Sequence, residues 1–292
     1  MNVKVVAVLG AGTMGRGIAQ TVATCGLYAR LFDVSKDALR EGIANALAGI
    51  ARTEAKGKIT RDEAENAREH LAAAAELEKA VGGADLVIEA VPESVELKTA
   101  LYAKVEPLLA ESAILATNTS SIPLRVLSEK LARPERFLGL HFFNPVPLMK
   151  LLEIVVGAKT DPSVVDAAGA FAQRIGKEAI LVKDSPGFAT SRLGVAIGIE
   201  AIRMLEDGVA SVDDIDKAME LGYAHPMGPL RLTDLVGLDV RLAIAEALEK
   251  ELGPRFAPPK ILREKVERGE LGKKSGRGFY TWEPSGAFKK SS

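Results

Sequence analysis

Residues 6–20, VAVLGAGTMGRGIAQ, decide the fold because they place three glycines in the pattern G-x-G-x-x-G between an apolar segment and a helical one. A strand before this pattern and a helix after it predict a dinucleotide-binding turn. Gly10 permits a tight turn, Gly12 lets the backbone approach a pyrophosphate, and Gly15 allows the helix to pack closely against the strand. The phosphates are then expected at the helix N-terminus.

A carboxylate follows at the distance that a dinucleotide site requires. The second apolar segment ends at Asp33, eighteen residues after Gly15. Asp33 can accept hydrogen bonds from both ribose hydroxyls and would repel a 2′-phosphate, so we predict NAD rather than NADP, although Lys36 lies nearby. The alternative is that Asp33 only caps the next helix. Thr13 and Met14, inside the glycine pattern, are predicted to contact the same cofactor.

Composition indicates a soluble globular protein with two domains, since 292 residues are 47% hydrophobic and 26% charged. Lysine plus arginine (38) nearly balances aspartate plus glutamate (39), which gives no reason to expect nucleic acid or a membrane surface as a partner. No apolar run is long enough for a transmembrane helix. The single cysteine, Cys25, excludes an intramolecular disulfide and a cysteine-built metal site, and its apolar setting favours inert packing over a redox role. We expect a cytoplasmic protein without a metal.

Short apolar segments alternate with helical patterns over the first part of the chain. Such segments, apolar on both faces, are typical of central strands in a mostly parallel sheet. We therefore predict a Rossmann-type α/β domain at residues 1–185 that binds NAD. The segments are VKVVAVL, YARLFDV, ADLVIEAV, AILATN, RFLGLHFF, KLLEIVV and EAILVK.

The strand pattern stops after KDSPGF, residues 183–188, and helical segments separated by glycine and proline follow. Ser211 with Asp214 three residues later predicts one helix start there. We expect an all-α domain at residues 186–292 that contributes to substrate binding and to dimerisation. Its first helix, RLGVAIGIEAIRMLEDG, is apolar around most of its circumference, which predicts a homodimer through this domain.

A long insert, residues 36–80, separates the second predicted strand from the third. It has the pattern of one helix through Arg52, a turn at AKGK, and a second helix capped by Thr60 with Glu63. This predicts a helical hairpin with a basic tip. The tip is either a solvated charged surface or a patch for a phosphate-bearing ligand, and its basic residues are Arg52, Lys56, Lys58 and Arg61.

The segment HFFNPVPLMKLLEIV, residues 141–155, holds one of only three histidines. It also carries Glu153 among leucine, isoleucine and valine, where a lone carboxylate is costly to bury. Positions 141 and 153 are equally far from Pro147, so an antiparallel hairpin turning there would set His141 opposite Glu153. A carboxylate on one ring nitrogen fixes the tautomer and leaves the other nitrogen for acid–base chemistry. A structural ion pair is the alternative, which the upstream dinucleotide motif disfavours.

Small hydroxyl residues follow another predicted strand. The segment ILATN ends at Asn118 and continues into Thr119, Ser120 and Ser121. Ligands of such folds bind at the carboxyl edge of the sheet, where these hydroxyls are expected. We predict Ser120 as a site residue and Ser121 as part of the turn.

Six motifs, in this order and spacing across nearly the whole chain, resemble those of a known family: GAGTMGRGIA, NTSSIP, HFFNPVPLMKLLEIV, KDSPGF, MGPLRLTDLVGLD and GKKSGRGFY. The chain resembles the L-3-hydroxyacyl-CoA dehydrogenases, including bacterial 3-hydroxybutyryl-CoA dehydrogenases. The resemblance implies a dinucleotide-binding domain joined to a helical dimerisation domain, with the active site in the cleft between them. The implied reaction is the reversible NAD-dependent oxidation of a (3S)-3-hydroxyacyl-CoA, such as 3-hydroxybutyryl-CoA, to the 3-oxoacyl-CoA.

The resemblance also implies roles for individual residues. His141 matches the catalytic base of the family, and Glu153 matches its orienting partner. Ser120 and Asn144 match the groups that contact the reacting substrate oxygen and position the histidine.

Further residues match binding positions. Glu93 and Lys98, in VPESVELK, match positions near the nicotinamide ribose, and Asn118 is assigned to the same cofactor. The basic hairpin tip, with Lys56, matches the region where the family receives the nucleotide end of coenzyme A.

The chain departs from the family at PGFATSR, where Ser191 replaces the asparagine of P-G-F-x-x-N-R that approaches the substrate. The same fold and histidine–glutamate pair also resemble carnitine and gulonate dehydrogenases, whose substrates are not thioesters. A small hydroxy acid would need an arginine for its carboxylate, and Arg192 is the candidate. A non-catalytic dinucleotide-binding protein is the third alternative, against which the intact set of Ser120, His141 and Glu153 argues.

Overall fold

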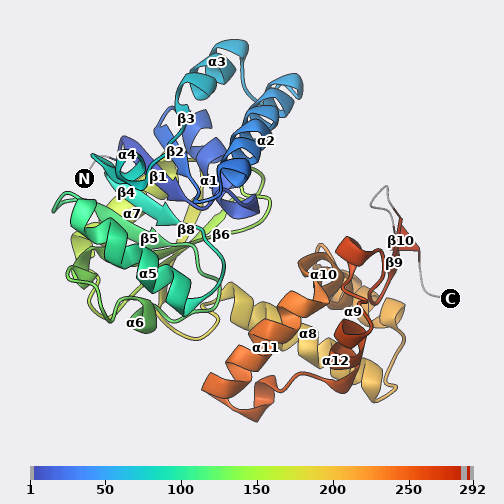
Figure 1. The fold of residues 1–292 in the computed structure, drawn as a ribbon. Helices are drawn as coiled ribbons and strands as arrows, with labels where there is room; N and C mark the ends of the chain where they lie inside the picture. The colour runs from blue at the N-terminus through green and yellow to red at the C-terminus, as the bar shows by residue number, and fades with distance from the viewer. Residues whose placement is uncertain (1–2, 284–287, 290–292) are drawn as a thin grey trace. The chain divides into compact units, whose positions relative to one another are not determined.

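The computed structural model describes residues 3–283 and 288–289. The chain divides into two compact units, Met1–Ser185 and Pro186–Ser292 (Figure 1). Each unit has its own hydrophobic core.

The first unit is built on one twisted eight-stranded sheet in the order β3-β2-β1-β4-β5-β6-β7-β8. Neighbouring strands are parallel except β6 and β7, which are antiparallel. The predicted Rossmann-type, mostly parallel sheet is therefore confirmed. Its strands are β1 (Val5–Leu9), β2 (Tyr28–Phe32), β3 (Leu71–Ala73), β4 (Leu86–Glu89), β5 (Ile114–Thr117), β6 (Phe137–Phe142), β7 (Leu151–Val156) and β8 (Glu178–Lys183).

Helices connect the parallel strands of this sheet, and several begin at side-chain caps. Ser35, Thr60, Ser94 and Asp161 each accept a hydrogen bond from a backbone N–H of the first helical turn. The helices are α1 (Thr13–Thr24), α2 (Lys36–Ala55), α3 (Arg61–Glu69), α4 (Leu77–Val81), α5 (Val95–Val105), α6 (Leu124–Leu127) and α7 (Pro162–Arg174), with 3-10 turns at Glu106–Leu108 and Pro134–Arg136.

The predicted helical hairpin is confirmed as α2 and α3, which lie side by side (Figure 1). Thr60 and Glu63 form the predicted capping box, because each side chain bonds to the backbone N–H of the other. Arg68 of α3 donates to Glu54 of α2 over 2.5 Å and so joins the two helices. The insert holds two elements that were not predicted. The strand β3 pairs with β2 at one edge of the sheet, and the short helix α4 begins at Leu77.

The prediction that all seven apolar segments are central strands is wrong for EAILVK. This segment forms β8, which is an edge strand with mostly exposed side chains. Leu181 is 67% exposed. The remaining predicted strands are mostly buried or half-buried, because helices cover both faces of the sheet.

The predicted helical second domain is confirmed, and it also contains two short strands. The short antiparallel strands β9 (Thr281–Trp282) and β10 (Phe288–Lys289) pair near the C-terminus. Ser211 caps its helix as predicted, by accepting from the N–H of Asp214. The helices are α8 (Thr190–Glu206), α9 (Val212–Gly222), α10 (Pro229–Val236), α11 (Leu238–Leu252) and α12 (Lys260–Glu267), with 3-10 turns at Pro254–Phe256 and Lys273–Ser275.

Buried carboxylates tie the C-terminal segment to the helices of this unit. Asp234 of α10 accepts from the backbone N–H groups of Phe279 and Tyr280 and from the indole N–H of Trp282. Asp216 of α9 accepts from the Tyr280 hydroxyl over 2.8 Å. These bonds satisfy carboxylates that would otherwise be costly to bury. In the part of the chain that the structure describes, no helix is long and apolar enough to cross a membrane.

Candidate active site

The glycine turn connects β1 to α1 in the geometry that a dinucleotide needs. Gly10 has φ +105°, a conformation that favours glycine, and a side chain there would also meet the Ala90 carbonyl. A side chain at Gly15 would overlap the Gly10 carbonyl oxygen, so the helix could not approach the strand. A Cβ at Gly12, by contrast, would meet nothing within 4 Å. The backbone at Gly12 therefore faces open space beside the N-terminus of α1, where a pyrophosphate fits.

Asp33 lies at the end of β2, beside the glycine turn. Its Oδ2 accepts from the Ala11 N–H over 2.8 Å, and its Oδ1 accepts from the Ser35 N–H over 2.9 Å. Ser35 is the residue that caps α2, so the alternative that Asp33 merely caps this helix is wrong. Each carboxylate oxygen has a second lone pair that a ribose hydroxyl can use. Beside Asp33, the side chain of Val34 is 89% exposed.

A buried ionic cluster lies under the carboxyl ends of β4 and β5. Glu89, fully buried, accepts from Lys98 Nζ over 2.6 Å, from the Tyr102 hydroxyl over 2.6 Å and from Thr117 over 2.8 Å. Burial and the Glu89 carboxylate raise the pKa of Tyr102 well above its usual value, so this hydroxyl stays a donor. Glu89 was not predicted from the sequence, although a lone acid in the apolar segment LVIEA gives the same signal as Glu153.

Glu93 organises the loop that carries Ser120. One of its carboxylate oxygens accepts from Thr119 Oγ1 over 2.6 Å and from the N–H groups of Ser120 and Ser121 over 3.0 and 3.1 Å. The other lies 3.3 Å from Lys98 Nζ. Desolvation alone would raise the pKa of Glu93, but Lys98 and these hydrogen bonds outweigh it and hold the pKa below its ordinary value. The predicted cofactor residues Glu93 and Lys98 thus belong to one cluster with the predicted substrate residue Ser120.

His141 and Glu153 form the pair that the hairpin symmetry predicted. The strands β6 and β7 place the two residues opposite each other, which confirms the predicted register. His141 Nδ1 lies 2.6 Å from Glu153 Oε2, and both side chains are buried. Because a carboxylate accepts, Nδ1 carries the proton and Nε2 is the nitrogen through which a proton can be exchanged.

Asn118 connects the Ser120 loop to the histidine strand. Its side-chain oxygen accepts from the N–H of Phe142, the residue after His141, over 2.9 Å. Because β5 and β6 are parallel neighbours, Ser120 and His141 follow or end adjacent strands at the same edge of the sheet. Asn144 lies two residues beyond Phe142, in the exposed loop between β6 and β7. Lys177 donates to the carbonyls of Val146 and Met149 and holds this loop in place.

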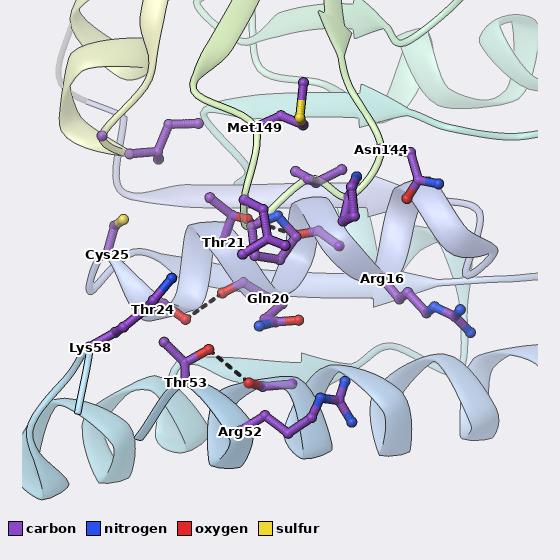
Figure 2. A pocket seen from close by; sticks show the side chains of 18 of the residues that line it. Arg16, Gln20, Thr21, Thr24, Cys25, Arg52, Thr53, Lys58, Asn144 and Met149 are labelled. Atoms are coloured by element: carbon purple, nitrogen blue, oxygen red, sulfur yellow. Dashed lines mark hydrogen bonds between the residues drawn. The ribbon is translucent and has the colours of Figure 1, made fainter. Parts of the chain in front are cut away.

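A pocket of about 550 Å³ lies between α1, the hairpin helix α2 and the loop that carries Asn144. Figure 2 shows Arg16 of α1, Arg52 of α2, and Asn144 and Met149 of the loop around it. None of the described residues that line it is acidic, so the pocket suits an anion. Arg61, predicted with the basic tip, is not among them and pairs with Glu65 instead. The basic lining residues are Arg16, Arg52, Lys56, Lys58, Lys150 and Lys177.

The remaining candidates lie in several parts of the structure. Cys25 lines the same pocket and packs against the core, and burial raises the pKa of its thiol, as expected for inert packing. Ser191 lies half-buried in the first turn of α8, in the second unit. Thr13 begins α1, and Met14 packs against the core of the first unit. Among residues 3–283 and 288–289, no cluster of histidine, cysteine and acidic side chains could hold a metal ion.

The Rossmann-type fold and the acid–base pair at the carboxyl edge of its sheet are typical of nicotinamide-dependent dehydrogenases. Comparison with known proteins identifies the family. Residues 5–185 match the 3-hydroxyacyl-CoA dehydrogenase NAD-binding domain, and residues 187–282 match the 3-hydroxyacyl-CoA dehydrogenase C-terminal domain. The chain belongs to the 3-hydroxyacyl-CoA dehydrogenase family, and its cofactor is NAD.

Individual relatives match over nearly their whole length. A probable 3-hydroxybutyryl-CoA dehydrogenase of Bacillus subtilis is 42% identical over 284 residues, which cover 97% of this chain and 99% of the relative. The mitochondrial hydroxyacyl-coenzyme A dehydrogenase of Sus scrofa is 39% identical over 96% of this chain and 91% of its own. The crystal structure of (S)-3-hydroxybutyryl-CoA dehydrogenase PaaH1 from Ralstonia eutropha matches with a TM-score of 0.92 at 38% identity, covering 97% of this chain and 100% of that one.

Proposed function

We propose that the chain catalyses the reversible NAD-dependent oxidation of a (3S)-3-hydroxyacyl-CoA to the corresponding 3-oxoacyl-CoA, with short-chain substrates such as 3-hydroxybutyryl-CoA. The observation that carries this proposal is the buried 2.6 Å bond between His141 and Glu153. It lies at the same sheet edge as the glycine turn, so an acid–base group and a dinucleotide site share one edge.

Proton transfer is assigned to His141. The imidazole Nε2 takes the proton of the C3 hydroxyl, and the carboxylate of Glu153 stabilises the imidazolium that forms. NAD, when bound, supplies the acceptor for the hydride that leaves C3, so the alcohol loses two electrons as a hydride and one proton to His141. Ser120 and Asn144 hold the substrate oxygen, which makes the proton transfer effectively intramolecular.

Cofactor binding is assigned to the groups along the same edge. Gly10, Gly12 and Gly15 shape the phosphate site, and Asp33 accepts from the ribose of the adenosine half. Glu93 and Lys98 lie next to the loop of Ser120, where the nicotinamide ribose is expected. Thr13, Met14 and Asn118 complete the predicted contacts.

The nucleotide end of coenzyme A is assigned to the basic pocket at the hairpin. Phosphate groups attract lysine and arginine, and six such residues, with no acid among the described lining residues, surround this pocket. A small free hydroxy acid offers no phosphate for these cations. The pocket therefore favours a coenzyme A thioester over a carnitine- or gulonate-like substrate, and Lys56 is one of the residues that would bind it.

Homodimerisation is proposed through the second unit. Large apolar side chains remain exposed on three of its helices, and exposed apolar surface can mark a protein–protein contact. A second copy of the chain would cover them in an isologous contact. The cytoplasmic location stays a prediction. The exposed side chains on α8, α10 and α11 are Leu193, Ile197, Leu232, Leu235, Val236 and Val240.

The decisive experiment measures NADH oxidation with acetoacetyl-CoA and with free acetoacetate. We expect turnover with the thioester and at most a trace with the free acid, because only the thioester reaches the basic pocket. Comparable kcat/KM values for the two compounds would contradict the coenzyme A assignment. Absence of turnover with every 3-oxoacyl-CoA would contradict the proposed reaction itself.

A further inference from the structure

A buried arginine in the second unit has no partner among the residues that the structure describes. Arg241 lies on α11 and is only 6% exposed. No residue within 3–283 or 288–289 forms a hydrogen bond or an ion pair with its guanidinium, and its Nε is fully enclosed without a partner. Burial lowers the pKa of Arg241 to about 10, so the side chain still carries its positive charge at neutral pH.

Two glycines of α8 make room for this guanidinium. A Cβ added to Gly194 would lie 3.0 Å from Arg241 Nη1, and one added to Gly198 would lie 3.9 Å from Nε. A larger residue at Gly194 would therefore crowd the cation, whereas a Cβ at Gly198 would touch it only at an ordinary contact distance. The space around the guanidinium is therefore formed by the backbone of α8 where it packs against α11, and it does not depend on the position of one flexible side chain.

An unpaired buried cation is costly, whereas two buried acids of the same unit are satisfied. Asp216 and Asp234 each accept three hydrogen bonds. A guanidinium left without an acceptor in such an environment destabilises the fold unless an anion joins it. Since Nε is enclosed, the residual exposure of the side chain lies toward its Nη end, where a carboxylate can bond to the planar fork.

The position of Arg241 suggests which anion this is. Ser191, Gly194 and Gly198 are three and four residues apart, so they share one face of α8. Gly194 lies about 4.5 Å further along the helix axis than Ser191, a distance that a few carbon–carbon bonds cover. The family resemblance assigns position 191 to the substrate, and on that assignment an acyl chain that passes Ser191 extends toward the Arg241 guanidinium.

We propose that Arg241 binds a carboxylate at the far end of the acyl group, so that the enzyme acts on 3-hydroxyacyl-CoA thioesters of dicarboxylic acids. This inference rests on the proposed function and narrows its substrate class. A 3-hydroxybutyryl chain ends in a methyl group and would leave Arg241 unpaired. A chain of six carbon atoms with a terminal carboxylate would form the ion pair that the described part of the protein does not provide.

The first test compares two substrates that differ only at the chain end, 3-oxoadipyl-CoA and 3-oxohexanoyl-CoA. Both have six-carbon acyl groups, but one ends in a carboxylate and the other in a methyl group. With the purified full-length enzyme and saturating NADH, we expect kcat/KM to be roughly 10- to 100-fold higher for 3-oxoadipyl-CoA. Equal values, or a preference for 3-oxohexanoyl-CoA, would overturn the inference. Inactivity with both thioesters and with acetoacetyl-CoA would instead contradict the proposed function.

The second test removes the cation. In Arg241→Met, kcat/KM for 3-oxoadipyl-CoA should fall to the value for 3-oxohexanoyl-CoA, while the rate with acetoacetyl-CoA stays within about twofold. Arg241→Lys keeps the charge but not the planar guanidinium. Its kcat/KM for 3-oxoadipyl-CoA should lie between the values of the wild type and Arg241→Met. Arg263→Met is the control, because Arg263 of the same unit is half-exposed and pairs with Glu246.

The melting temperature separates a ligand site from a structural role. Removing an unpaired buried charge should leave the Tm of ligand-free Arg241→Met equal to or above that of the wild type. A large fall in Tm, or equal losses of activity on all three thioesters, would show that Arg241 serves the fold instead. If Arg241→Met dissociated a dimer without changing the substrate preference, its anion would be an acid of a second copy, and the inference would be wrong.

Discussion

His141 and Glu153 face each other across β6 and β7, and the same two residues are joined by a 2.6 Å bond from Nδ1 to Oε2. Two separate features therefore position the imidazole: the register of the two strands and the hydrogen bond between the side chains. Because strands tolerate no slip of one residue without exchanging their faces, this pair is held more firmly than one carried by loops. The rigidity favours a role in proton transfer, which demands a fixed donor and acceptor geometry.

Replacing His141 should remove proton transfer but not cofactor binding. We expect His141→Ala and His141→Gln to lose roughly 10²–10⁴-fold in kcat, the usual contribution of a general base. NADH binding, followed by fluorescence titration, should stay within about twofold of the wild type. His70→Gln is the matched control, since His70 lies at the C-terminal end of α3 in the hairpin. A near-wild-type kcat in either His141 variant would remove the proposed mechanism.

Replacing Glu153 by glutamine should act through the histidine. Glutamine retains an acceptor for Nδ1 but loses the charge that stabilises the imidazolium, so we expect a lower kcat and a pH–rate profile of kcat/KM that is shifted or flattened. Steady-state rates measured across the pH range provide the readout. Glu178→Gln, an exposed position on β8, is the control. An unchanged profile in Glu153→Gln would assign the pair a purely structural role.

Asp33 should determine the preference between the two nicotinamide cofactors. Asp33→Ala removes the two proposed hydrogen bonds to the ribose and the charge expected to repel a 2′-phosphate. NAD affinity should therefore fall by roughly 10-fold, while NADP affinity falls less or improves. Loss of the bonds to Ala11 and Ser35 would weaken both cofactors alike, which is why the ratio of the two Kd values is the measurement. Asp37→Ala, on the exposed face of α2, should leave the ratio unchanged. An unchanged ratio of the NAD and NADP Kd values in Asp33→Ala would show that Asp33 has no part in cofactor choice.

Glu93 should affect both the Ser120 loop and the acid stability of the protein. Glu93→Gln keeps an acceptor for the Ser120 and Ser121 N–H groups but weakens the contact with Lys98, and we expect kcat/KM to fall by about 10-fold. The pKa of Glu93 lies below its ordinary value of 4.5 in the folded state. Its stabilising effect is therefore present above that value and is lost as the pH falls through the lowered pKa.

The comparison is the melting temperature of wild type and Glu93→Gln between about pH 6 and pH 3. The wild type should lose more Tm over this interval, because only its Glu93 must take up a proton. Glu96→Gln controls for activity, since Glu96 is an exposed residue in the first turn of α5 that accepts from the Ser94 hydroxyl. An equal fall in Tm between about pH 6 and pH 3 in the wild type and in Glu93→Gln would argue against a lowered pKa of Glu93.

Sequence patterns predicted the parts of the fold that depend on local rules. The glycine turn, the Thr60–Glu63 capping box and the register of His141 with Glu153 follow from spacing, and the structure confirms each of them. The strand β3 was missed because its three residues, LAA, form a strand only through pairing with β2. The exposure of β8 was missed because an apolar segment does not reveal that its strand lies at the edge of the sheet.

Site residues were missed where their roles depend on distant partners. Glu89 carries the signal of a lone acid in an apolar strand, yet its partners Lys98, Tyr102 and Thr117 come from two later elements. Arg241 gives no signal at all, since an arginine within a helix is ordinarily exposed. Its burial depends on tertiary packing, including that of α11 against Gly194 and Gly198 of α8.

By the family resemblance, Ser191 stands where many members have an asparagine. A serine has one hydroxyl and a shorter reach, so it either contacts the substrate through a water or has withdrawn from it. If it contributes one neutral hydrogen bond, worth about 0.5–1.5 kcal/mol, Ser191→Ala should lower kcat/KM by roughly 2- to 12-fold. That loss is far smaller than the loss expected for His141. Thr190→Ser, at the adjacent position of α8, is the control because it keeps the hydroxyl and removes only a methyl group.

The reciprocal variant Ser191→Asn discriminates between two kinds of pocket. If the substrate is a 3-hydroxyacyl-CoA, the longer amide restores the commoner pattern, and we expect kcat/KM on acetoacetyl-CoA to stay within about threefold of the wild type. A pocket rebuilt around the smaller side chain would instead be blocked by the larger one, and Ser191→Asn would be inactive. An unchanged kcat/KM for Ser191→Ala on every thioester tried would show that the residue no longer contacts the substrate. Inactivity of Ser191→Asn, with a melting temperature equal to the wild type, would favour a substrate other than a thioester.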